Sequence, residues 1–281
     1  ERRDLMDRTA IITGASGGIG AEVARELARR SWRVAVVGRN KARTEEVARL
    51  VEGTPFVCDF DRLDDVRELA ETLDTRYDRI DAIVNNAGGI VGKRAVSADG
   101  NELTLQRNVL GSVVLTERLV PKLLHSRGRV VHTSSLVSRF GRIALGDVNY
   151  EKRRYGAGWW PYASAKLGVI LYARSLAART GLESFPVHPG YVRSGFGAES
   201  KSGKLILALT GWMQISPEAG AASIVHAVDT PELGVPNGTY FDGLTPDGPT
   251  HIAAGDEKLI KAYWREIAAL TGCEAEHYQA T

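Results

Sequence analysis

The sequence has no long apolar run and few cysteines, and each shortage argues against a class of protein. No run approaches the ~20 apolar residues that cross a bilayer, and ERRDLMDR at the start offers no apolar segment for a signal peptide. We therefore expect a soluble protein without a membrane span. The two cysteines, Cys58 and Cys273, lie far apart, and no CxxC or HxxxH spacing supplies metal ligands. We expect no metal site and a reducing, cytoplasmic setting.

Charge of one sign is also scarce. The 36 Lys and Arg residues face 34 Asp and Glu residues, which gives a formal net charge of +2 without long single-sign runs. Neither a nucleic-acid surface nor an acidic tail is indicated, so a small molecule is the expected partner. The 281 residues, 43% of them hydrophobic, are enough for one large domain with a sizeable core.

Short apolar runs, most of them continuous and bounded by turn residues, predict strands buried on both faces of a parallel sheet. These runs are residues 9–14, 33–38, 54–59, 81–86, 128–135, 185–190 and 238–243. Helical patterns alternate with them, among them residues 101–126, residues 162–180 and a helix that Ser216 is expected to cap. The alternation predicts an α/β fold over residues 1–281: a single Rossmann-type doubly wound domain with a seven-stranded, mostly parallel sheet flanked by helices.

The stretch TGASGGIG, residues 13–20, follows the first predicted strand and opens a helix, which is the context that a phosphate-binding turn requires. Gly14 permits a tight turn, Gly18 lets the backbone approach a pyrophosphate, and Gly20 allows close helix packing. The helix N-terminus favours the negative charge of the phosphates. The cofactor-binding residues predicted on this turn are Gly14, Ser16, Gly17, Gly18, Ile19 and Gly20.

The end of the second predicted strand, VVGRN, bears on which dinucleotide binds. An Asp or Glu there would bond the ribose hydroxyls of NAD, but Gly38 offers no carboxylate that would repel a 2′-phosphate. Arg39 offers a guanidinium suited to that phosphate, with Ser16 and Asn40 as helpers. The sequence thus favours NADP(H) over NAD(H). The alternative is that Arg39 merely ends the strand at the surface.

Six motifs occur in order over most of the chain, between the predicted strands. They are TGASGGIG at 13–20, NNAG at 85–88, Asn108, SS at 134–135, YASAK at 162–166 and HPGYVRS at 188–194. Together they resemble the short-chain dehydrogenase/reductase family. LGDVNYEKRRYGAGWWPYASAK, with its insertion before the tyrosine, and the later SPEAGA and GTYFDG resemble retinol dehydrogenase-like NADP-dependent reductases within it.

The resemblance implies four catalytic residues. Tyr162 would be the general acid/base. Lys166, one helical turn away, would stabilise its phenolate and bind the nicotinamide ribose. A free tyrosine has a pKa of about 10, so it needs such a positive charge to act near neutral pH. A serine would polarise the substrate oxygen, and alignment with the family's strand selects Ser135 over the adjacent Ser134. Asn108 would hold a water in a proton relay; the alternative is a helix-interior amide satisfied by its neighbours.

The resemblance also implies cofactor contacts outside the glycine turn. These are Asp59 and Phe60 near the adenine, Asn86, Ala87 and Gly88 on the adenosine side, and Pro189, Gly190, Val192 and Ser194 at the nicotinamide end, with Tyr162 and Lys166. The NNAG segment would serve the fold and the cofactor about equally. His132 and His188 lie inside predicted strands without companion ligands, so we interpret both as core histidines.

Two irregular segments, residues 139–160 and 195–216, follow the fifth and sixth predicted strands, where ligands bind in open α/β sheets. We interpret them as substrate-loop insertions, and expect the first to be a substrate wall or lid. The candidate pocket residues, which would suit a hydrophobic polyketide, terpenoid, steroid or retinoid-like substrate or else simply fill the core, are Tyr155, Trp159, Trp160, Phe196, Leu205, Trp212 and Met213.

These observations favour an NADP(H)-dependent oxidoreductase, a ketoreductase or alcohol dehydrogenase that transfers hydride between the nicotinamide and a hydrophobic carbonyl or alcohol, with secondary metabolism as one setting. The alternatives are a non-catalytic dinucleotide-sensing module and a non-redox lyase or epimerase on the same scaffold. The resemblance further implies a homodimer or homotetramer formed through residues 101–126 and 162–180. The insertion at 139–160 would instead leave a monomer if it covered the second helix.

Overall fold

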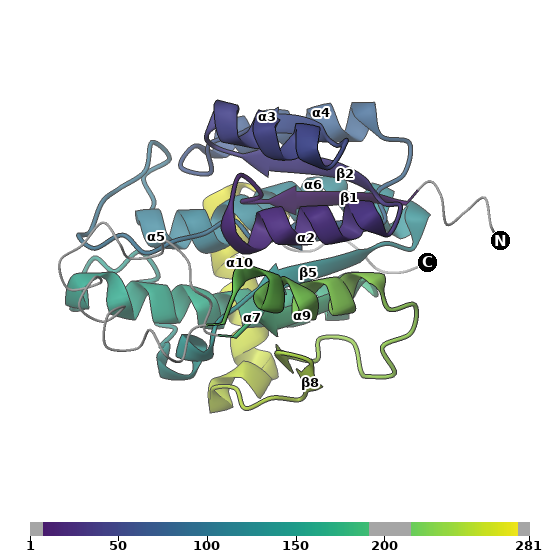
Figure 1. Ribbon diagram of the computed structural model, residues 1–281. Coiled ribbons are helices and arrows are strands. Elements are labelled where there is room, and N and C mark those ends of the chain that lie inside the picture. Colours follow the sequence, from purple (N-terminus) through teal and green to yellow (C-terminus); the bar gives the residue numbers. More distant parts are fainter. Residues whose placement is uncertain (1–7, 191–214, 275–281) are drawn as a thin grey trace.

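The computed structural model describes residues 8–190 and 215–274, which form one α/β domain around a central sheet (Figure 1). The sheet order is β3-β2-β1-β4-β5-β6-β7-β8, and neighbouring strands from β3 to β7 are parallel. The chain order of the strands reverses between β1 and β4, which is the switch point where doubly wound sheets bind ligands. The strands are β1 (Thr9–Thr13), β2 (Arg33–Gly38), β3 (Thr54–Val57), β4 (Ala82–Asn85), β5 (Arg129–Thr133), β6 (Glu183–His188), β7 (Phe241–Asp242) and β8 (Thr245–Pro246).

The predicted doubly wound α/β fold is confirmed, but the predicted strand count of seven is wrong. The described residues form an eight-stranded sheet, in which β8 pairs antiparallel with β7 through Phe241 with Pro246 and Asp242 with Thr245. The last predicted strand, 238–243, also shrinks to the two residues of β7. A two-residue strand carries no repeating pattern, so β8 leaves no signal in the sequence.

The helices begin and end close to the predicted ranges. Ser216 caps α9, because its Oγ accepts from the amide of Ala219 at 3.2 Å, as predicted. The predicted helix at 101–126 consists of three consecutive pieces, of which the middle one, η1, is a π-helix. The helical elements are α2 (Gly18–Arg29), α3 (Lys41–Leu50), α4 (Leu63–Arg76), α5 (Leu103–Leu105), η1 (Gln106–Leu110), α6 (Gly111–Ser126), η2 (Leu136–Phe140), η3 (Gly156–Gly158), α7 (Trp159–Thr180), α9 (Pro217–Asp229), η5 (Ile252–Gly255) and α10 (Glu257–Thr271).

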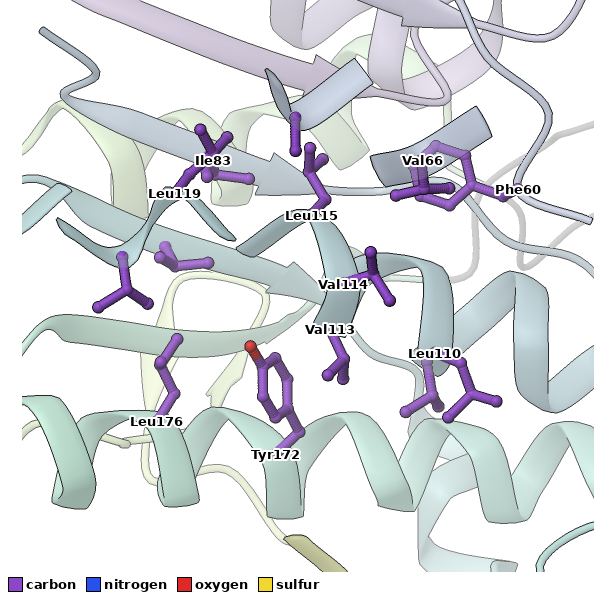
Figure 2. Packing of buried hydrophobic residues seen from close by; sticks show 14 of the residues in the cluster. Phe60, Val66, Ile83, Leu110, Val113, Val114, Leu115, Leu119, Tyr172 and Leu176 are labelled. Carbon is purple, nitrogen blue, oxygen red and sulfur yellow. The ribbon is translucent and has the colours of Figure 1, made fainter. Parts of the chain in front are cut away.

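Helices cover both faces of the sheet, and successive strand residues face opposite layers. Ile11 of β1 belongs to the core shared with α4, α6, α7 and α10, whereas its neighbours Ala10 and Ile12 belong to the core shared with α2, α3 and α9. Figure 2 shows the first core, where Val113 of α6 points toward α7 beside Tyr172. Both faces are therefore apolar, which explains why the strand runs are continuous rather than alternating.

Helix α10 packs against α7 within the same chain. The indole of Trp264 stacks on Tyr172 with ring centroids 6.0 Å apart, and the Arg179 guanidinium lies 3.7 Å from the centre of that indole. Tyr263 presses against Gly168, where a Cβ would lie 2.1 Å from the phenol oxygen. Much of the surface of α7 is thus used inside the chain, and self-association through it stays a prediction. Among residues 8–190 and 215–274, no helix has the length and apolarity needed to cross a membrane.

Candidate active site

The glycine turn leaves open space in front of the first turn of α2. Gly14 and Gly18 have φ of 65° and 56°, in the left-handed region that favours glycine. A Cβ on Gly20 would lie 2.5 Å from the carbonyl oxygen of Gly14, so helix and turn approach as closely as backbones can. In contrast, a Cβ on Gly17 would meet nothing within 4 Å, and no side chain caps α2. The first amides of α2 therefore face a space that an anionic group can enter.

Thr13 joins this turn to the segment after β4. Its Oγ1 donates to the carbonyl of Val84 at 3.2 Å and accepts from the amides of Asn86 and Ala87 at 2.9 and 3.0 Å. The side-chain amide of Asn86 donates to the carbonyl of Thr13 at 3.1 Å. These bonds give the NNAG segment the structural role expected for it. Sequence reasoning missed Thr13, although a threonine that ends a buried strand inside a phosphate-binding motif is a usable signal.

The end of β2 has no room for an acidic side chain. A Cβ on Gly38 would lie 2.5 Å from Oγ1 of Thr44 and 2.8 Å from Cβ of Ser16. Next to it, the Arg39 side chain is 65% exposed, and its guanidinium lies 3.7 Å from the carboxylate of Asp61. Asn40 caps α3, because its Oδ1 accepts from the amide of Arg43 at 3.0 Å. This oxygen of the predicted phosphate-binding residue is therefore already used by the helix.

Asp59 and Phe60, predicted near the adenine, follow β3. Oδ1 of Asp59 accepts from the amide of Asp61 at 3.1 Å, which shapes the turn after this strand. Phe60 is buried in the core beside Val66 (Figure 2), and a Cβ on Gly111 would lie 2.5 Å from its ring. The side chain of Phe60 therefore serves the core, and its contact with adenine stays a prediction.

The two adjacent serines after β5 point to different partners. The hydroxyl of Ser135 is hydrogen-bonded to Tyr162, whereas Ser134 donates to the backbone carbonyl of Lys166 at 3.0 Å. Burial raises the pKa of Tyr162 above its ordinary value, and the bond with Ser135 acts in the opposite direction. Ser135 is thus the serine beside the phenol, in agreement with the choice made from the sequence.

Lys166 is buried beside the tyrosine. Its Nζ donates to the carbonyl of Thr133 at 2.9 Å and lies 5.5 Å from the ring centre of Tyr162. Burial lowers the pKa of Lys166 to about 8, because the ammonium form is poorly solvated. A Cβ on Gly88 would lie 3.5 Å from this Nζ and 2.4 Å from Oδ1 of Asn108. The side chains of Lys166 and Asn108 therefore both lie close to Gly88, in space that a larger residue there would occupy.

Asn108 lies in the π-helix η1, a kind of irregularity that often marks functional sites. Its side-chain amide donates to the carbonyls of Gly89 and Thr104 at 2.7 and 2.8 Å, and its Oδ1 accepts from the amide of Gly89 at 3.2 Å. Both amide hydrogens are therefore used by the backbone, as in the alternative considered from the sequence. The water-binding role of Asn108 stays a prediction.

The insertion at 139–160 is anchored by hydrogen bonds to two distant residues and by one bond within itself. The phenol of Tyr155 donates to the fully buried carboxylate of Glu102 at 2.7 Å, which burial and two amide bonds hold in place. The phenol of Tyr150 donates to the carbonyl of Trp160 at 2.8 Å, and Arg94 donates to the carbonyl of Tyr150 at 3.1 Å. Glu102 was missed by sequence reasoning, because nothing local marks its partner. The lid role of the insertion is untested.

The remaining predicted residues divide into two groups. Trp159 and Trp160 belong to the first turn of α7, 41% and 46% exposed, and Gly190 has a φ of 90° directly after Pro189. The residues that lie outside the described part of the chain are Val192, Ser194, Phe196, Leu205, Trp212 and Met213.

The interpretation of His132 as a core histidine is confirmed. Its ring nitrogens lie 3.3 Å from the side-chain amide of Asn85 and 3.2 Å from the hydroxyl of Ser184, and burial lowers its pKa to about 3. Burial also lowers the pKa of His188. Within the described ranges, no group of three His, Cys, Asp or Glu side chains is placed to hold a metal ion.

Comparison with known proteins agrees with this geometry. A family model described as short chain dehydrogenase matches residues 8–204. Human retinol dehydrogenase 13 is 31% identical over 96% of this chain and 86% of its own. The protein DnrU of Streptomyces sp. (strain C5), named as a proposed daunorubicin C-13 ketoreductase, is 36% identical over 95% of this chain and 94% of its own.

A solved structure is similar over almost the whole chain. The crystal structure of an uncharacterized protein from Mycobacterium paratuberculosis is 30% identical and superposes with a TM-score of 0.76, covering 96% of this chain and 95% of its own. The predicted resemblance is thereby confirmed. The chain belongs to the short-chain dehydrogenase/reductase family, whose oxidoreductases act on CH–OH and C=O groups.

Proposed function

We propose that this enzyme is an NADP(H)-dependent oxidoreductase that interconverts a hydrophobic carbonyl compound and its alcohol. The observation that carries the proposal is the cluster of Ser135, Tyr162 and Lys166 at the carboxyl end of β5. There the Ser135 hydroxyl is hydrogen-bonded to the Tyr162 phenol, and Nζ of Lys166 lies 5.5 Å from the centre of the Tyr162 ring. The cluster shares its end of the sheet with the glycine turn, through Gly88 and the NNAG segment.

The residues present fit a nicotinamide dinucleotide. The turn at Gly14 and Gly20 has no space for side chains on its packed side, while Gly17 and Gly18 face open space, as a pyrophosphate cradle requires. The preference for NADP(H) is supported by Arg39, which is exposed at the end of β2, and by Gly38, where an acidic side chain would collide with Thr44. When bound, the nicotinamide supplies or accepts the hydride.

In the reducing direction, the chain's own residues handle the proton. The hydroxyls of Ser135 and Tyr162 hold the substrate oxygen, and Tyr162 passes its phenolic proton to that oxygen. Burial alone opposes loss of this proton, since it raises the pKa of Tyr162. The ammonium of Lys166 is the nearby charge that favours the phenolate. In the oxidising direction, the phenolate takes the proton of the alcohol.

The proposed substrate is bulky and mostly apolar. The exposed side chains of Phe140, Trp159 and Trp160, at η2 and the start of α7, support this choice. Two relatives are named for retinol and for a C-13 ketone of daunorubicin, which are consistent with it. Products of secondary metabolism are one source of such compounds.

The test is a panel of aromatic and alicyclic ketones with NADPH and with NADH, followed by cofactor absorbance. We expect turnover with NADPH, and a loss of about 10²- to 10⁴-fold in kcat for Tyr162→Phe with an unchanged Kd for NADPH. Near-normal kcat in that variant would refute the assignment of Tyr162. Product formation without any change in cofactor absorbance would point to lyase or epimerase chemistry, and cofactor binding without turnover would point to a sensing module.

A further inference from the structure

Three charged side chains from distant parts of the sequence meet beside the end of β2. Arg39 follows β2, Asp61 follows β3, and Arg107 lies in η1. We call them the Arg39–Asp61–Arg107 cluster. Both arginines approach the same carboxylate, so the cluster carries two positive charges and one negative charge.

The carboxylate is shared unequally. Arg107 binds it with two donors, Nε to Oδ1 and Nη2 to Oδ2, the second at 2.5 Å. This fork geometry matches a carboxylate and is the stronger of the two arrangements. Arg39 approaches Oδ2 only to 3.7 Å, beyond hydrogen-bond distance, and its side chain is 65% exposed against 26% for Arg107. Asp61 is therefore committed to Arg107.

We infer that Arg107 is a specificity-determining residue for the cofactor: by occupying Asp61, it leaves the guanidinium of Arg39 available to a 2′-phosphate. This inference rests on the proposed NADP(H) function. Without Arg107, the same carboxylate would pair with Arg39 alone, and the net charge of the cluster would fall from +1 to zero. A 2′-phosphate would then have to replace the Asp61 carboxylate as the partner of Arg39, so its binding would release less free energy.

Arg107 also has a structural role, and the test must separate this role from its effect on cofactor choice. Arg107 directly precedes Asn108 in η1, so its bond to Asp61 also ties the π-helix to the turn after β3. Loss of this tie would affect stability and turnover with either cofactor. Loss of the charge effect would affect NADPH alone, because NADH lacks the 2′-phosphate.

The experiment measures Kd for NADPH and NADH by fluorescence titration of the protein, at low and high salt. Arg107→Met keeps the aliphatic stem and removes the charge. We expect it to weaken NADPH by about fivefold, the upper range for partly exposed ion pairs, and to leave NADH unchanged. High salt should shrink the difference. Arg118→Met is the matched control, since Arg118 of α6 makes an exposed ion pair with Glu71 of α4 at 3.4 Å.

Asp61→Asn supplies an independent arm. It removes the carboxylate charge that competes for Arg39, so we expect NADPH affinity to hold or increase. In the Asp61→Asn background, Arg107→Met should have little further effect on the ratio of the two Kd values. Equal weakening of both cofactors by Arg107→Met, or an undiminished effect when it is combined with Asp61→Asn, would overturn the inference.

Failure of the proposed function would look different. A wild-type protein that binds NADH as tightly as NADPH, or an Arg39→Ala variant that weakens both equally, would remove the NADP(H) preference itself and the inference with it. An Arg39→Ala variant that weakens NADPH alone, together with an Arg107→Met variant that changes neither, would keep the function and overturn only the role of Arg107.

Discussion

The glycine turn and the insertion at 139–160 both belong to the candidate site, but different forces hold them. The turn is fixed by backbone against backbone, as at Gly20, where a Cβ would lie 2.5 Å from the oxygen of Gly14. The insertion is fixed by long side chains that reach distant partners, as in the bond from Tyr155 to Glu102 at 2.7 Å.

The difference explains which region can be identified from sequence. Where two backbones touch, only glycine fits, so the contact leaves a glycine at a fixed spacing in the chain. Where a phenol reaches a carboxylate 53 positions away, either residue could stand at many other positions without a visible change of pattern. The glycine pattern therefore identifies the turn in the sequence alone, whereas no pattern identifies the anchors of the insertion.

The strongest test of this comparison is Gly20→Ala. We expect a loss of about 1–3 kcal/mol in the free energy of unfolding, because the added methyl group forces backbones apart, together with weaker cofactor binding. Gly17→Ala is the control, since its Cβ meets nothing within 4 Å and its φ of 169° suits any residue. Urea denaturation of both variants measures the effect. Equal stability would show that the turn tolerates side chains after all.

Lys166→Met tests helix α7, which follows the insertion directly in the chain. Burial lowers the pKa of Lys166 from 10.5 to about 8, so below pH 8 the buried ammonium costs stability, up to about 3 kcal/mol before its bond to Thr133 is counted. From pH 8 to 10.5 the unfolded chain holds a proton that the folded protein lacks, so wild-type stability rises through this window.

We therefore expect Lys166→Met to be inactive but more stable than the wild type at pH 7, with an advantage that shrinks toward pH 10. Denaturation at both pH values measures it. An advantage that is the same at pH 7 and pH 10 would contradict the assigned pKa.

Tyr155→Phe tests the insertion. Removing this hydroxyl leaves the buried carboxylate of Glu102 without one of its donors, and we expect a loss of about 1–2 kcal/mol with faster proteolysis between residues 139 and 160. Tyr263→Phe is the control, because the buried hydroxyl of Tyr263 has no hydrogen-bond partner among the described residues. The anchor assignment is wrong if both variants lose the same stability.

The smallest effect on stability is expected for the pair Trp159→Ala and Trp160→Ala. Both indoles are more than 40% exposed, so the melting temperature should change little while KM for a bulky ketone rises and NADPH affinity holds. Trp160 also lies against Gly156, so a purely anchoring role is the competing prediction. A lowered melting temperature with unchanged substrate selectivity would decide for anchoring and against a substrate wall.

The α/β alternation, the glycine turn and the pair of Tyr162 and Lys166 can be identified from the sequence, because each depends on spacing between residues that are close along the chain. Alternation along an extended chain also separates Ser134 from Ser135, and the structure has Ser135 beside Tyr162; the catalytic role of Ser135 stays a prediction. Tertiary structure alone decided the antiparallel β8, the links through Thr13 and Glu102, the covering of α7 by α10, and the meeting of Arg39, Asp61 and Arg107. These depend on which distant segments become neighbours, and the physical reason is that hydrogen bonds and ion pairs act over a few ångströms of space, whatever the separation along the chain.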